Sequence, residues 1–270
     1  MRSCGSRSPW ASAAPSGASA AERGARRIRL LVWNLFHGRS LPASRHELIE
    51  HFASRIAAWQ WDAALLQEVP PWWPAPLARR AEAGERTALT SRNALLPLRR
   101  ALARRRPELM KSNGGGSNAI LVHGEITEHA ALRLRTWPER RVAQLVRLAD
   151  GRTLVNYHAS RGPERAREEL ERLYRHALGW ARGAPLVIAG DLNLRALPPL
   201  RGFTHIAQRD VDHVLACGYR AARPPALLER DAVVDGRRVL LSDHVPILAE
   251  LQETGRSGPS EPLTPPRTSA

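Results

Sequence analysis

Polar side chains that could do chemistry recur in this sequence, each at the end of an apolar run typical of a buried strand. Ligands in open α/β sheets bind beyond strand ends, so we expect these distant side chains to converge on one cleft. Carboxylate and amide oxygens suit a hard cation such as Mg²⁺, and histidines transfer protons or bind phosphate. The residues concerned are Asn34, Glu68, His158, Asp191, Asn193, Asp243 and His244.

Glu68 is the best candidate for a metal ligand. It follows the apolar run AALL and Gln67, and a carboxylate at the end of a buried strand needs a cation or hydrogen-bond donors to offset its desolvation. An ion pair with one of the many arginines is the alternative. Asn34 follows LLVW. Its amide could orient a phosphate oxygen or hold a neighbouring ligand, or it could only form a turn at the strand end.

Asp191 and Asn193 stand two residues apart after the run PLVIAG. In an extended chain, residues i and i+2 point to the same side. The carboxylate and the amide can therefore face the same atom, unless they only form an Asp-x-Asn turn. Gly190 precedes them and allows the backbone to approach a ligand closely.

His244 follows Asp243 after the run RRVLLS, and Asp212 begins the run DHVLA. A carboxylate such as Asp212 would fix the tautomer of His244 and stabilise its charged form. His244 could then act as a base. Alternatively, it could bind phosphate as a cation while Asp191 activates the water.

Seven short motifs occur in a fixed order between about Ile28 and Leu251: WN, QE, SNAILV, NYH, GDLN, VDHVL and SDH. In this order the sequence resembles the endonuclease/exonuclease/phosphatase superfamily, which has a deoxyribonuclease-like fold. The resemblance implies that Glu68 holds the essential divalent ion, Mg²⁺ or Mn²⁺. It also implies that Asp191 orients or activates the attacking water and that Asn193 contacts a phosphoryl oxygen.

The resemblance extends to the remaining polar positions. It implies that His158 is a general acid or a phosphate contact, and it favours Asp212 over His213 as the partner of His244. Asn34 is expected to contact the substrate phosphate and to bind the metal ion. Asp243 is expected to be a further metal ligand.

Arginine and tryptophan side chains near these motifs could contact the substrate. Arg141 or Arg140 could bind the scissile phosphate, although a solvated surface charge is the alternative in so arginine-rich a chain. Trp72 and Trp73 follow the Glu68 strand closely. They could stack on a base, or they could pack beneath a proline-rich loop.

The order of the predicted elements indicates the fold class. Strands mostly follow one another directly, with few helices between them, which favours an α/β (α+β) four-layer sandwich of two packed mixed β-sheets with outer helices. The same order argues against a Rossmann or barrel array. We predict one such domain over residues 27–253. Residues 1–26 and 254–270 are predicted to be disordered tails because their Ser, Ala, Gly, Pro, Arg and Thr content cannot bury enough apolar surface.

Local patterns predict three particular elements. Ser44-Arg45-His46-Glu47 reads as a capping box that opens a helix. Residues 141–148 and 153–158 read as a hairpin around Asp150-Gly151. Pro163 suits the first position of a long amphipathic helix. Residues 75–110 are expected to hold arginine-rich helical pieces.

The charge of the chain points to an acidic partner. The formal net charge is +15, and Lys111 is the only lysine among the 41 basic residues. A basic body favours a polyanionic or phosphorylated partner such as nucleic acid, while a general bias toward arginine codons is the alternative. We find no signal peptide and no membrane span in the sequence. A cytoplasmic monomer is the expectation.

These features together predict a divalent-metal-dependent phosphoesterase that hydrolyses a phosphodiester by activated water. A nuclease is the preferred interpretation. A phosphatase or phosphodiesterase acting on a phosphorylated small molecule or a lipid head group is the first alternative. The second alternative, from another class, is a nucleic-acid-binding protein that keeps the fold without catalysis.

Overall fold

The computed structural model describes residues 26–90, 93, 95–106 and 116–255. The predicted tails lie almost wholly outside these residues, so their disorder remains a prediction. The described chain begins its first strand, β1, at Arg27 and ends its last strand, β16, at Glu253.

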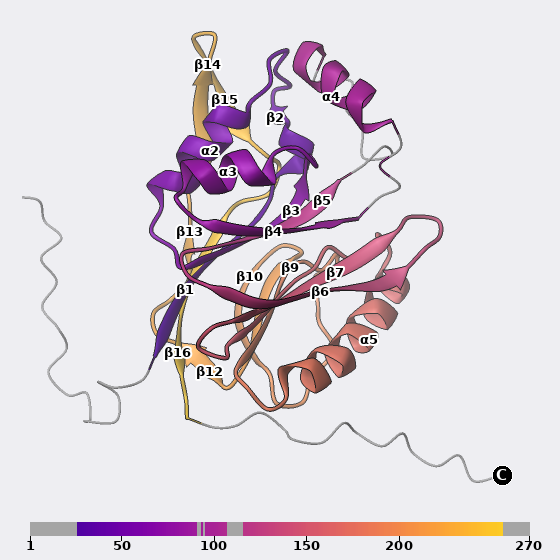
Figure 1. The fold of residues 1–270 in the computed structure, drawn as a ribbon, viewed down its shortest axis with the longest axis vertical. Helices are drawn as coiled ribbons and strands as arrows, with labels where there is room; N and C mark the ends of the chain where they lie inside the picture. Colours follow the sequence, from indigo (N-terminus) through magenta and orange to yellow (C-terminus); the bar gives the residue numbers. More distant parts are fainter. Residues whose placement is uncertain (1–25, 91–92, 94, 107–115, 256–270) are drawn as a thin grey trace, which may run out of the picture.

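Two mixed sheets pack face to face and helices cover their outer sides (Figure 1). The first sheet has the order β12-β16-β1-β3-β5-β4, with β13 also paired to β16. The predicted four-layer sandwich is therefore confirmed. The strands of this sheet are β1 (Arg27–Asn34), β3 (Ala63–Val69), β4 (Gly84–Leu89), β5 (Ser117–Val122), β12 (Tyr219–Ala221), β13 (Ala226–Leu227) and β16 (Ile247–Glu253).

The second sheet has the order β10-β11-β9-β8-β7-β6. Strand β8 runs parallel to β9, while β9 and β11 are antiparallel. This arrangement brings the end of β9 beside the beginning of β11. The strands are β6 (Ile126–Arg135), β7 (Arg141–Leu148), β8 (Thr153–Asn156), β9 (Leu186–Asp191), β10 (Thr204–Arg209) and β11 (Asp212–Cys217).

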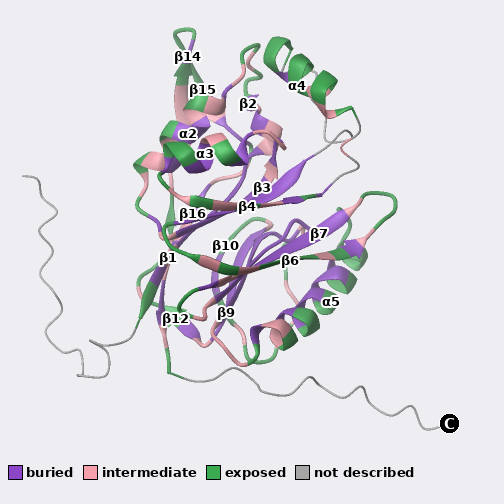
Figure 2. Cartoon of the chain, in the orientation of Figure 1, coloured by how far each residue is buried: buried purple, intermediate pink, exposed green. Residues whose placement is uncertain are grey.

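Among the described residues, three apolar cores hold the layers together, and Figure 2 shows the buried strands between the partly exposed helices. One core lies between the sheets and includes Val32, Leu65 and Val187. A second packs α2 (Ile49–Ala58) and α3 (Pro74–Arg80) onto the first sheet. The third packs α5 (Pro163–Ala181) onto the second sheet. Burial of apolar surface from both sides explains why several strands read as unbroken apolar runs.

A small third sheet lies at one end of the sandwich. It joins β14 (Asp231–Val234), β15 (Arg237–Leu241) and β2 (Ser40–Leu41). Strand β15 leads directly into Ser242, so this sheet delivers the SDH motif to the end of β1. The short 3-10 turn η1 (Phe36–Gly38) follows β1 at the same end.

The predicted hairpin is confirmed by the antiparallel pair β7 and β8, and Pro163 does begin α5. The prediction of a capping box at Ser44–Glu47 is wrong. The helix α2 begins at Ile49 and has no side-chain cap, while Ser44 Oγ accepts a hydrogen bond from the backbone N–H of His46. The expected helical pieces of residues 75–110 correspond to α3 and α4 (Leu96–Arg105), but strand β4 between them was not foreseen. In the described part of the chain no helix is long and apolar enough to cross a membrane.

Candidate active site

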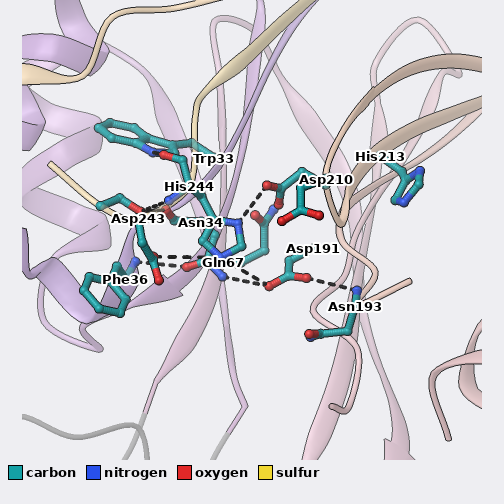
Figure 3. Close-up of polar contacts among 12 residues, drawn as sticks. Trp33, Asn34, Phe36, Gln67, Asp191, Asn193, Asp210, His213, Asp243 and His244 are labelled. Carbon is teal, nitrogen blue, oxygen red and sulfur yellow. Dashed lines mark hydrogen bonds and ion pairs between the residues drawn. The ribbon is translucent and has the colours of Figure 1, made fainter. Parts of the chain in front are cut away.

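Asp191 lies at the centre of the polar cluster that the strand ends form (Figure 3). Its carboxylate is 3% exposed. Asn34 donates a side-chain hydrogen bond to Oδ2 (3.0 Å), and the backbone N–H of Asn193 donates to Oδ1 (3.0 Å). His158 Nε2 lies 3.4 Å and His244 Nε2 3.8 Å from the same Oδ2. The ends of β1 and β9 therefore fix this carboxylate between two imidazoles.

His244 and Asp212 form the dyad that the sequence predicted. His244 Nδ1 lies 2.7 Å from Asp212 Oδ2. Asp212 faces Asp191 across the antiparallel pair β9 and β11, which places the two carboxylates on neighbouring strands. His213 points the other way, where its ring nitrogens contact Leu194 O and His205, and Figure 3 shows it apart from the cluster.

A bulge in β3 projects Glu68 toward the same cluster. Between Leu66 and Val69 the strand β3 has one residue more than β5, and Glu68 has a φ of 50°. Bulges re-aim side chains in this way next to functional sites. Its carboxylate lies 3.1 Å from His37 Nε2 and 3.8 Å from His158 Nε2.

The loop with the SDH motif is tied to the end of β1. Ser242 Oγ donates a hydrogen bond to Asn34 O (2.6 Å) and accepts one from the backbone N–H of His244 (3.0 Å). The indole N–H of Trp33 donates to His244 O (3.1 Å). These bonds fix the position of His244. Asp243 lies at the rim, where its side chain is 42% exposed and its Oδ1 is 3.9 Å from His244 Nε2.

Gly190 meets a steric demand at this site. Its φ is 137°, and a Cβ there would lie 2.1 Å from Tyr157 O. The parallel strands β8 and β9 therefore approach closely where they carry His158 and Asp191. Only glycine combines this backbone conformation with so close an approach.

The polar residues Asn156, Gln67 and Asn118 lie between the two sheets. Asn156 Nδ2 donates to the carbonyls of Leu66 and Ala119 in the other sheet, and its Oδ1 accepts from Gln67. Asn118 Nδ2 donates to Val142 O. All three are fully buried, so they join the sheets beneath the site.

Arg141 lies beside the cluster. Its side chain is buried and pairs with Glu139. Burial lowers the pKa of His158 well below its usual value, and the charge of Arg141 lowers it further. His158 is therefore neutral at pH 7.

His37 is a residue of this cluster that the sequence did not reveal. It lies in η1 with a φ of 54°, after Phe36 with a φ of 50°. Two successive left-handed residues are rare outside glycine, and this turn is what carries the His37 ring to Glu68. The NLFHG sequence has no periodicity that would have shown it, and only the histidine near the end of the first strand could have been a signal.

The surroundings of Asp191 and His244 raise the pKa values of both groups. Burial raises the pKa of Asp191 to about 7, and the charge of Asp212 adds to the effect. Burial alone would lower the pKa of His244, but the hydrogen bond and charge of Asp212 raise it to about 9. At neutral pH, His244 is a cation and Asp191 is poised to accept a proton.

A divalent cation fits the chemistry of this cluster. Asp191, Asp212 and His244 each have one potential ligand atom within 4.8 Å of the others, and His244 would bind an ion only in its neutral form. Within the described residues, Asp212 Oδ1 is buried without a hydrogen-bond partner. The ligands predicted from the sequence, Glu68, Asn34 and Asp243, form a different set. The hydrogen bond from Asn34 to Asp191 connects the two sets. Oxygen donors predominate in both sets, as a hard cation requires.

Comparison with known proteins identifies the family. The model of the "Endonuclease/Exonuclease/phosphatase family" matches residues 31–244, most of the chain. The chain belongs to this family. Its members are hydrolases that act on phosphoester bonds, and the resemblance seen in the sequence is confirmed. No curated protein sequence matches the chain.

Solved structures of the endonuclease/exonuclease/phosphatase fold resemble the chain at low sequence identity. A family protein from Beutenbergia cavernae has a TM-score of 0.62 at 17% identity, covering 86% of this chain and 72% of the other. D. rerio TDP2 in complex with a single-strand DNA product has a TM-score of 0.60 at 16% sequence identity, and the match covers 83% of this chain and 98% of that one. A mannosyl-6-phosphatase from Bacteroides thetaiotaomicron has a TM-score of 0.59 at 14% sequence identity, and the match covers 83% of this chain and 99% of that one. At these identities the likeness shows the fold alone.

In this family member, a buried carboxylate braces the loop that carries His158. Glu169 of α5 is 1% exposed. It accepts hydrogen bonds from Tyr157 Oη, from both the backbone N–H and Oγ of Ser160, and from Arg135 Nε. Burial would raise the pKa of Glu169, but the hydrogen bonds from Ser160 and Tyr157 leave it below its usual value. These contacts fix both flanks of His158 to the helix.

We expect Glu169→Ala to destabilise the protein by about 3–5 kcal/mol, because it leaves Arg135 and two hydroxyls without their buried acceptor. For a domain of this size, such a loss lowers the melting temperature by roughly 10 °C. Glu168→Ala is the matched control, since Glu168 pairs with the same Arg135 at the surface with its side chain 68% exposed. Thermal unfolding of the two variants decides the point, and equal melting temperatures would contradict the role of Glu169.

Proposed function

We propose that this chain is a divalent-metal-dependent phosphodiesterase that cleaves nucleic acid. The observation that carries the proposal is the placement of Asp191. It is held by Asn34 and Asn193, faced by two histidines, and set beside the Asp212–His244 dyad. This arrangement supplies a proton acceptor, Asp191, beside a cation, His244, with 3.8 Å between Asp191 Oδ2 and His244 Nε2.

In the proposed reaction, water attacks phosphorus, the ester P–O bond breaks, and Asp191 takes the proton of the water. A base whose pKa is about 7 combines a sufficient ionised fraction with useful basicity at neutral pH. The cationic His244 stabilises charge on the phosphoryl oxygens and can supply the proton that the leaving oxygen takes up. The neutral His158 can donate a hydrogen bond to the phosphate.

Glu68 would hold the metal ion, with Asn34 and Asp243 as further predicted ligands. When bound, a divalent ion makes phosphorus more electrophilic and neutralises charge on the leaving oxygen. Mg²⁺ or Mn²⁺ suits these oxygen donors. Arg141, buried beside His158, is the proposed contact for the scissile phosphate.

The net charge of +15 supports nucleic acid as the substrate over a single phosphorylated small molecule. A long polyanion gains from basic surface beyond the reacting phosphate, whereas a small phosphomonoester contacts only the central cluster. The predicted cytoplasmic location and monomeric state remain predictions.

A side-by-side assay tests this function. Purified protein in Mg²⁺ or Mn²⁺ is given a single-stranded oligonucleotide, a duplex, a sugar 6-phosphate and a phospholipid. We expect kcat/KM for an oligonucleotide to exceed that for the sugar phosphate at least tenfold, a difference of about 1.4 kcal/mol in transition-state stabilisation. A tenfold preference for the sugar phosphate or the phospholipid would overturn the choice of substrate. Oligonucleotide binding without hydrolysis of any compound would overturn the catalytic assignment.

A further inference from the structure

A cavity of about 500 Å³ lies between the turn after β3 and helix α4. This volume is within the range of small-ligand pockets in proteins. Figure 1 shows α4 at the edge of the molecule, beyond the ends of β3 and β5. The residues that line the cavity are Pro71, Trp72, Leu96, Pro97, Arg100, Ala101 and Arg104.

The two adjacent tryptophans after Glu68 have different environments. Trp73 is 2% exposed and packs in the core against Phe52, with 5.3 Å between ring centroids. Trp72 is only half buried and lines the cavity. Its indole N–H donates to Glu47 Oε1 (3.3 Å), which fixes the ring. Trp72 packs in part against the core of α2 and α3, and it also presents a fixed aromatic surface to the cavity.

Positive charge faces this aromatic surface from α4. Arg104 Nε lies 3.9 Å from Glu47 Oε2, so one carboxylate contacts both Arg104 and Trp72. Within the described residues, Arg100 has no ion pair or hydrogen bond. An exposed guanidinium near a fixed indole is a combination that can bind a phosphate and a base together.

The turn after β3 connects this cavity to the candidate active site. Glu68 is the penultimate residue of β3, and Trp72 lies four residues after it in the turn that lines the cavity. The cavity therefore begins close along the chain to the residue predicted to hold the metal ion.

The packing of α4 does not explain its composition. Ala103 is the one residue of α4 that is buried within the described structure, while Leu98 is 64% exposed. The helix contributes arginines at positions 99, 100, 104 and 105. A helix with so little core contact and so many cations is more readily understood as a surface for an anionic ligand.

We propose that this cavity is a subsite for one nucleotide of a single-stranded nucleic acid, next to the scissile phosphate. Trp72 stacks on the base, while Arg100 and Arg104 bind the adjoining phosphates. A base within a duplex is already stacked, so only an unpaired base can reach the indole face. The inference rests on the proposed function for its substrate class, but not on the catalytic step.

Binding of a fluorescently labelled oligonucleotide, measured by anisotropy in chelator so that no cleavage occurs, tests the subsite. One stacked base contributes about 1–3 kcal/mol. We expect Trp72→Ala to weaken binding of the single strand about tenfold or more and Trp72→Phe to restore most of it. Arg100→Ala should reduce the slope of log K against log salt by about 0.7, the value for one phosphate contact on a single strand.

Arg175→Ala is the matched control for Arg100→Ala, because Arg175 is an exposed arginine on α5, across the sandwich from α4. We expect its salt slope to equal that of the wild type. The subsite is refuted if Trp72→Ala binds within twofold of the wild type, if Trp72→Phe binds no better than Trp72→Ala, or if Arg175→Ala changes the slope as much as Arg100→Ala. It is equally refuted if the wild type does not bind the oligonucleotide.

The two proposals fail in different ways. If the wild type hydrolyses none of the phosphoesters but Trp72→Ala loses oligonucleotide binding, the catalytic assignment is wrong and the subsite stands. If the wild type cleaves the oligonucleotide and Trp72→Ala binds and cleaves it normally, the subsite is wrong and the function stands.

Discussion

We expect chelation of divalent ions to abolish hydrolysis by this protein, and Glu68→Gln to raise the Mg²⁺ concentration for half-maximal activity by about a hundredfold or more. Glutamine preserves the size of the side chain but removes its charge. Even residues that only support metal ligands contribute 10- to 100-fold to metal affinity in other proteins, so the loss of a direct ligand should reach the upper end of this range. Initial rates across a Mg²⁺ titration measure the effect.

A second measurement of the Glu68 variant does not depend on turnover. Ligand binding to the folded state raises its stability according to the ratio of ligand concentration to Kd, so Mg²⁺ should raise the melting temperature of the wild type more than that of Glu68→Gln. Glu128→Gln is the control, since Glu128 pairs with Arg147 away from the site. Full activity in excess chelator, or an unchanged Mg²⁺ response in Glu68→Gln, would contradict this assignment of the metal site.

Strand ends made the central residues of the site predictable. An apolar run followed by a polar side chain marks the place where a buried strand meets solvent, and sheet geometry brings such places together. Asp191 and His158 meet because β8 and β9 are parallel neighbours. Asp212 meets Asp191 because β9 and β11 are antiparallel, with these two residues directly paired. The fold class was predictable for a different reason: strands follow one another with few helices between them, which favours two packed mixed sheets.

Residues placed by unusual backbone conformations could not be predicted in this way. His37 reaches Glu68 only through successive positive φ values at Phe36 and His37, and Glu68 faces the cluster through a bulge. Strand β4 was missed because its sequence GERTAL is polar and lies among arginine-rich segments. Its pairing with β5, and not local preference, makes it a strand.

The environment of a polar residue at a strand end could not be predicted either. Asn156 and His158 are two residues apart, yet Asn156 bonds to backbone carbonyls of the opposite sheet while His158 lies in the cluster. Asn156 satisfies polar groups between the two sheets, whereas His158 lies where we propose that the chemistry takes place. The amide of Asn156 could have served either role, so only the packing of the two sheets shows which role Asn156 has.

We expect Asp191→Asn to lower kcat by about 10²–10⁴-fold at pH 8, the usual contribution of a general acid–base group. In the wild type, the rate should rise about tenfold per pH unit below pH 7, because the pKa of Asp191 is raised to about 7 and only its ionised form accepts a proton. The rate should fall above pH 9, because the pKa of His244 is raised to about 9 and only its protonated form is a cation. The expected profile has a maximum between these values.

Two further variants separate the groups behind this profile. Asp212→Asn removes the charge that raises the pKa of His244, so the fall in rate at high pH should begin at a lower pH. Asp210→Asn also removes one negative charge near the dyad, but Asp210 is a surface residue paired with Arg195, and its profile should match the wild type. If Asp191→Asn retained wild-type turnover, Asp191 could not be the proton acceptor. The buried carboxylate beside two histidines would then have an electrostatic role toward the cation, and the base would have to be sought in the Asp212–His244 dyad.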